Sequence, residues 1–159
     1  MVAPSLTYTN KRTKKKVIND YILKEILKAE KKIADRGVKV TTGRVIAEQT
    51  LGFWNSFYET HHYALLVGVP CQIFKKLPYG YGRKEINDII VQVRELRNRI
   101  NHNEPICFVN RKCDFSYVRN MYRMISDFLT WIDPAIMLSL KEVDKVCKVI
   151  EKEENKQKQ

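Results

Sequence analysis

The sequence predicts an all-α protein, a helical bundle of about five to six helices with no sheet. Apolar residues recur at helical spacing in several segments, whereas no segment alternates apolar and polar residues as a half-buried strand does. No internal repeat and no glycine-rich phosphate loop occurs. With 159 residues, of which 44% are hydrophobic, the chain is long enough for one domain with a modest core.

The first elements are a basic arm and two helices. Residues 1–16 end in clustered lysines and arginines and are expected to form a flexible arm, either solvated or in contact with RNA; the solvated state is favoured. A helix is predicted over about 17–36, ending at Gly37, and Thr41 and Thr42 are suitable caps for the next helix.

The middle of the chain carries four aromatic residues within 51–58. Aromatic residues this dense usually build a core, and a platform for stacking bases is the less favoured alternative. His61 and His62 follow and are expected at the surface, because adjacent residues point in different directions on a helix. A metal site there is not expected, nor one at the four cysteines, which include no CxxC pair.

The second half contains the most periodic helix, predicted over about 83–101 after a loop rich in proline and glycine. Asp114 is expected to cap a helix that ends before Pro134, and a last helix is predicted over about 139–151. We therefore expect a single helical domain over 17–151 and a disordered polar tail over 152–159.

The charge of the chain suggests an anionic partner. Lysine and arginine number 29 against 18 acidic residues, giving a formal net charge of +11, and nucleic acid is the leading candidate. The longest apolar runs are too short to span a bilayer, and no signal peptide is recognisable, so we expect no membrane association and a cytoplasmic protein.

The helix over 83–101 carries the candidate site. Its apolar residues share one arc of the helical wheel, and the opposite arc carries five polar residues: Arg94, Arg97, Asn98, Asn101 and His102. Asn98 and His102 are four residues apart and are therefore neighbours on one face. Taken alone, this spacing favours a simpler interpretation, in which His102 and Asn103 cap the last carbonyls of the helix.

These residue types suit the cleavage of RNA, which supplies its own nucleophile, the 2′-hydroxyl. Histidine can accept or donate the proton, and a guanidinium suits the charge that develops on the phosphate. Asn98 can donate to a phosphate oxygen or hold His102 in one tautomer. The mechanism needs no metal and no cofactor, but it needs a second acid or base, which a two-fold dimer would supply.

Residues 96–106, with Arg97, Asn98 and His102 before a Glu-Pro-Ile turn, resemble the signature segment of Abi-like HEPN proteins. Residues 40–54 and 128–134 also resemble blocks of that family, in the same order. The resemblance implies a dimeric HEPN bundle with metal-independent endoribonuclease activity. It also implies a role in abortive infection against phage, with an RNA or protein antitoxin as a possible partner. Arg97 and His102 would be catalytic and Asn98 supportive, and Arg94, Arg99 and Asn101 are expected to contact RNA.

Two departures from the family pattern keep an alternative open. Asn103 stands where family members usually have a second histidine, and the chain begins later than family members do. The alternative is a HEPN bundle that binds RNA or a partner protein without cutting. A helical dimer with a structural role alone is the third interpretation, and it predicts no salt-dependent RNA binding.

Overall fold

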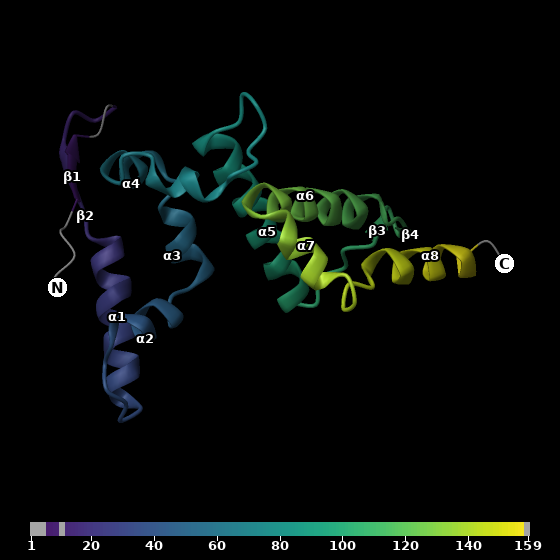
Figure 1. Cartoon of the computed structure of the whole chain (residues 1–159), viewed down its shortest axis with the longest axis horizontal. Coiled ribbons are helices and arrows are strands. Elements are labelled where there is room, and N and C mark those ends of the chain that lie inside the picture. Colours follow the sequence, from purple (N-terminus) through teal and green to yellow (C-terminus); the bar gives the residue numbers. More distant parts are fainter. Residues whose placement is uncertain (1–5, 10–11, 158–159) are drawn as a thin grey trace. The chain divides into compact units, whose positions relative to one another are not determined.

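The computed structural model describes residues 6–9 and 12–157. Figure 1 shows the chain, which divides into two compact units with the boundary in the sequence between Gly68 and Val69. The sequence predicts one domain over 17–151. Val67 and Gly68 have φ angles of 48° and 78°, in the left-handed region that ends helices, and they follow the last helix of the first unit. The boundary between the units therefore falls where left-handed residues end a helix. The spacing of hydrophobic residues in the sequence does not reveal such a break.

The N-terminal unit begins with a β-hairpin, so the expectation of no sheet is not confirmed. Strands β1 (Leu6–Thr9) and β2 (Lys16–Asn19) pair antiparallel, with Thr9 opposite Lys16. The hairpin occupies much of the segment predicted to be a flexible arm; residues 1–5 and 10–11 of that arm lie outside the described residues. Threonine, tyrosine, valine and isoleucine favour strands, and this local preference prevails over the helical spacing that starts at Val17.

Four helices complete this unit: α1 (Tyr21–Asp35), α2 (Thr42–Ala47), α3 (Leu51–Ser56) and α4 (Thr60–Leu65). Thr41 caps α2 as predicted, because its hydroxyl accepts a hydrogen bond from the backbone N–H of Arg44. Thr50 caps α3 in the same way through the N–H of Phe53. The two caps therefore mark the starts of two separate short helices.

The core of the N-terminal unit lies between α1 and the aromatic segment. Ala29 and Ile33 of α1 and Phe53 of α3 are buried. The Phe53 ring makes edge-to-face contacts with Trp54 and Phe57, at centroid distances of 5.2 Å and 5.1 Å. The prediction that these aromatic residues build core is confirmed for Phe53 and Tyr58, while Trp54 remains 38% exposed.

The C-terminal unit starts with a short 3-10 helix (Val69–Ile73) and contains two long helices, α5 (Arg83–Asn101) and α6 (Ser116–Ile132). Both match the predicted segments closely. Ile86 and Ile89 of α5 and Met121 of α6 are buried, as the apolar arc of α5 requires. A second, very short hairpin joins the helices, formed by β3 (Phe108–Val109) and β4 (Lys112–Cys113).

Two helices close the unit where one is predicted: α7 (Pro134–Leu140) and α8 (Val146–Gln157). Asp133 ends α6 and caps α7, with its carboxylate accepting a hydrogen bond from the N–H of Ala135. Helix α8 extends through the segment predicted to be a disordered tail, of which 158–159 lie outside the described residues. Its extension has a physical reason, since Arg119 of α6 donates two hydrogen bonds to the carboxylate of Glu154.

The fold is therefore mostly helical, with eight α-helices and two small hairpins in the part of the chain that the structure describes. None of the helices found there combines the length and the apolar character that crossing a membrane requires.

Candidate functional site

A backbone motif at Asn103 ends helix α5. Asn103 has a φ angle of 55°, a left-handed conformation that asparagine tolerates better than most residues. Its N–H donates to the carbonyl of Ile100, and the N–H of Glu104 donates to the carbonyl of Arg99 at 2.8 Å. These two bonds form a Schellman motif, which ends the helix at Asn101 and makes His102 the C-cap.

Three predicted site residues lie exposed at this helix end: Arg97, Asn98 and His102. Within the described residues, no hydrogen bond or ion pair engages their side chains. Asn98 and His102 are joined through the backbone, since the N–H of His102 donates to the carbonyl of Asn98 at 3.0 Å. Asn101 is also exposed, whereas Arg94 is half-buried one helical turn before Arg97.

Arg99, by contrast, is engaged within the chain. Its guanidinium donates to the carbonyl of Pro105 at 2.5 Å, lies 3.6 Å from the carboxylate of Glu104, and stands 5.1 Å from the ring centroid of Tyr117. These contacts hold the loop after α5 against the end of the helix. The first role of Arg99 is therefore structural, and RNA contact by this residue stays a prediction.

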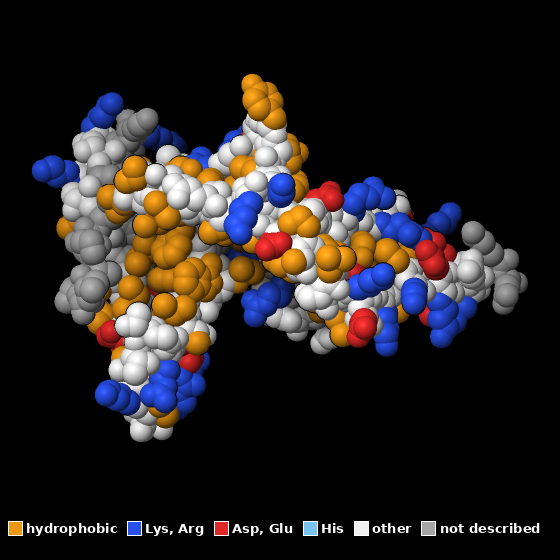
Figure 2. Space-filling model, viewed as in Figure 1, with side chains coloured by type: hydrophobic (Ala, Val, Ile, Leu, Met, Phe, Trp, Pro, Cys, Tyr) orange, Lys and Arg blue, Asp and Glu red, His pale blue; other side chains and the backbone are white. Residues whose placement is uncertain are grey.

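The C-terminal unit carries many positively charged side chains at its surface. Figure 2 shows Lys and Arg side chains spread over the visible face of the C-terminal unit, with Asp and Glu side chains among them. A dispersed positive surface attracts polyanions without selecting a sequence. A net charge of +11 is large for a chain of 159 residues, so the attraction to polyanions is expected to be strong.

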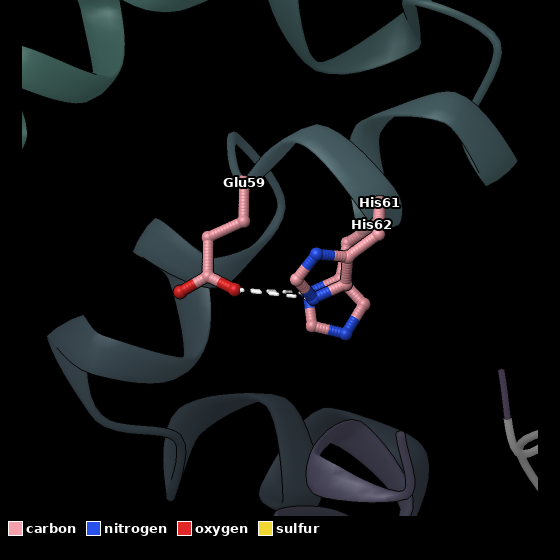
Figure 3. Close-up of side chains that lie close together, drawn as sticks. All are labelled: Glu59, His61 and His62. Atoms are coloured by element: carbon pink, nitrogen blue, oxygen red, sulfur yellow. Dashed lines mark ion pairs between the residues drawn. The ribbon is translucent and has the colours of Figure 1, made fainter. Parts of the chain in front are cut away.

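The structure corrects the interpretation of His61 and His62. His62 is 2% exposed rather than at the surface, and the two imidazole rings lie together, with centroids 4.4 Å apart. Both belong to the first turn of α4, and the Glu59 side chain points at them from the residue before the helix (Figure 3). The sequence does contain a signal for this group, because a glutamate stands two residues before the first of two adjacent histidines. The argument that adjacent side chains point in different directions on a helix obscures that signal.

The distances within this group are short. The Glu59 carboxylate oxygen lies 3.4 Å from Nε2 of His61 and 3.6 Å from Nδ1 of His62. Burial lowers the pKa of His61, the neighbouring His62 lowers it further, and Glu59 raises it by a smaller amount. His61 is therefore held toward its neutral form, in which an imidazole nitrogen has a lone pair to donate.

The chain thus has two candidate groups of functional side chains, one in each unit. Comparison of the chain with models of known protein families, with curated proteins and with solved structures gave no match.

Proposed function

We propose that the chain is a metal-independent endoribonuclease of the HEPN type, active as a dimer, with Arg97, Asn98 and His102 at its active site. The observation that carries the proposal is the end of α5. There, three side chains suited to RNA cleavage are exposed and unengaged within the described residues, while Arg99 and Asn103 fix the surrounding backbone. The resemblance of residues 96–106 to the Abi-like signature supports the same assignment.

The proposed chemistry divides the work among the three residues. His102 takes the proton from the 2′-hydroxyl, or delivers one to the departing 5′-oxygen, as a general base or acid. The guanidinium of Arg97 binds the phosphate and stabilises the charge that develops as the 2′-oxygen attacks. The Asn98 amide, one turn before His102, donates to a phosphate oxygen or orients the imidazole.

A second copy of the chain completes the site in this proposal. Each chain brings one histidine to this helix end, whereas cleavage needs a base and an acid at the same phosphate. A two-fold axis between two α5 ends would bring a pair of His102 and a pair of Arg97 side chains together. Arg94 and Asn101 would then extend the RNA-binding surface, and the biological role would be RNA cleavage as a toxin or in defence against phage.

The decisive test is His102→Ala in the full chain, assayed on single-stranded RNA of mixed sequence in the presence of EDTA. We expect cleavage to fall by about 10²–10⁴-fold, the usual contribution of a general acid or base, with RNA affinity nearly unchanged. The matched control is Glu95→Ala, an exposed change on the same helix, which should leave cleavage intact. Unchanged cleavage by His102→Ala would overturn the assignment.

The second candidate is a bundle that binds RNA without cutting it. It is favoured by Asn103, which serves in the Schellman motif at the position where a second histidine would be expected. Under this alternative, the wild-type chain binds RNA with an affinity that falls steeply with salt, and no cleavage is detected at any protein concentration.

A further inference from the structure

The N-terminal unit contains a side-chain cluster that the proposed ribonuclease does not use: Glu59, His61 and His62. One possible ligand atom from each residue lies within 4.8 Å of the others. Their exposure is graded, because His62 is 2% exposed, His61 28% and Glu59 47% at the side chain. The cluster thus reaches from the core of the unit to solvent, which gives an ion a path of entry.

The distances fit a tetrahedral metal centre. Zinc bonds to imidazole nitrogen and carboxylate oxygen are about 2.0–2.2 Å long, so two ligands at the tetrahedral angle lie about 3.4 Å apart. The Glu59 oxygen lies 3.4 Å from Nε2 of His61 and 3.6 Å from Nδ1 of His62. A carboxylate oxygen of Glu59 therefore lies at about the ligand–ligand separation of a tetrahedral site from a nitrogen of each imidazole.

Asn19 sets the tautomer of His61. The Asn19 Oδ1 atom accepts a hydrogen bond from the N–H of Tyr21 at 3.0 Å, which leaves the amide nitrogen facing Nε2 of His61 at 2.8 Å. An amide N–H can only donate, so Nε2 of His61 is the unprotonated nitrogen. This is the atom that faces Glu59, and an ion bound there would replace the Asn19 amide as its partner.

His62 can offer its Nδ1 atom to a metal after a change of tautomer. Its Nδ1 lies 3.0 Å from the carbonyl oxygen of Ser56, which that nitrogen uses as an acceptor when it is protonated. The same carbonyl accepts a second hydrogen bond from the N–H of Glu59 at 3.0 Å. The buried carbonyl therefore keeps a partner when the proton of His62 moves from Nδ1 to Nε2 and Nδ1 offers its lone pair to a metal.

We propose that Glu59, His61 and His62 bind one Zn²⁺ ion, with water in the fourth position. Two imidazoles and one carboxylate are a ligand set that zinc uses, whereas magnesium and calcium prefer oxygen ligands alone. The ion would hold the N-cap residue Glu59 and the first turn of α4 together and stabilise the N-terminal unit. This site is independent of the proposed ribonuclease, because cleavage by His102 and Arg97 uses no metal.

The test measures Zn²⁺ binding by the full chain after removal of metal, in competition with a chromogenic chelator. We expect the wild-type chain to bind one equivalent, and His61→Gln and Glu59→Gln to bind at least about 100-fold more weakly, since even outer-shell changes cost about 10–100-fold. These two residues are chosen over His62 because its burial makes substitution harmful to folding. The matched control is His102→Gln, which removes an exposed histidine elsewhere and should leave Zn²⁺ affinity unchanged.

Two further measurements establish whether the ion occupies this cluster in the folded chain. Saturating Zn²⁺ should raise the melting temperature of the wild-type chain but not that of His61→Gln, because only a folded site gains from the ion. Co²⁺ in place of Zn²⁺ should show no thiolate charge-transfer absorption, since none of the four cysteines belongs to the site. Equal affinity in wild type, His61→Gln and Glu59→Gln, or a thiolate spectrum, would overturn the proposal.

Discussion

Replacing Arg99 and Arg97 by alanine should separate two roles that neighbouring arginines play on one helix. Arg99 donates to the Pro105 carbonyl and stacks on Tyr117, whereas Arg97 is exposed and unengaged within the described residues. A hydrogen bond from a charged donor is worth about 1.5–3 kcal/mol, and a partly exposed cation–π contact about 0.5–1 kcal/mol. The ion pair of Arg99 with Glu104 at 3.6 Å adds close to nothing to stability, because both side chains are more than a third exposed.

Because the Arg99 side chain is 37% exposed and these terms overlap, we expect Arg99→Ala to cost about 2 kcal/mol. For a unit of this size that loss lowers the melting temperature by about 8–16 °C. Arg97→Ala should change stability by less than about 0.5 kcal/mol, as exposed substitutions usually do. Thermal melts followed by circular dichroism would measure both.

The same two variants should behave in the opposite way in the cleavage assay, performed well below either melting temperature. Arg97→Ala should lose cleavage, since it removes the proposed phosphate ligand, while Arg99→Ala should retain a larger share of it. Equal melting temperatures for the two variants would refute the structural role of Arg99. Full cleavage by Arg97→Ala would refute its place in the active site.

Four other outcomes are expected. Ile86→Ala should lower the free energy of unfolding of the C-terminal unit by about 2–5 kcal/mol in urea melts, because Ile86 is fully buried; a loss below about 1 kcal/mol would contradict the packing. RNA cleavage should survive EDTA at temperatures well below unfolding, and its loss there would point to a different active site. Arg97→Lys should cleave poorly, as an ammonium cannot make the two-pronged contact of a guanidinium, so wild-type rates would exclude that contact. The metal-free chain should lose stability as the pH falls through about 6.5, the ordinary pKa of histidine. The pKa of His61 is lowered in the folded chain, so the unfolded chain takes up the proton first and is stabilised by it. Denaturant melts from pH 8 to 5 should show a smaller loss of stability in His61→Gln than in the wild-type chain. Identical pH profiles for the two chains would argue against this role of His61.

The long helices are predictable from the sequence because the signals that define them are local. Helix α5 begins and ends as its apolar period indicates, with Glu85 accepting a hydrogen bond from the N–H of Gly82 at the start. The end of α6 before Pro134 follows from the restriction that proline places on the preceding residue. Thr41 is a further cap that the sequence alone identifies.

The features that the sequence does not predict depend on contacts between distant residues or on loop geometry. The extension of α8 relies on the Arg119–Glu154 pair, whose partners are 35 residues apart. The Glu59 cluster is hidden from a helical wheel because Glu59 precedes the first turn of α4. The wheel also gives only the directions in which His61 and His62 leave the backbone, whereas their rings lie with centroids 4.4 Å apart. The dimer that the proposed active site requires is a property of two chains, and no pattern within one chain specifies its geometry.

The Schellman motif at Asn103 has a consequence for any ligand that reaches the end of α5. The backbone around His102 is already ordered, so a bound molecule does not have to freeze it, and the entropy lost on association is confined to side chains and to the ligand itself. Because the helix end does not reshape itself, the ligand has to conform to it, and only a chain that can bend is able to do so. Unpaired stretches of nucleic acid should therefore be engaged more readily there than stiff duplexes.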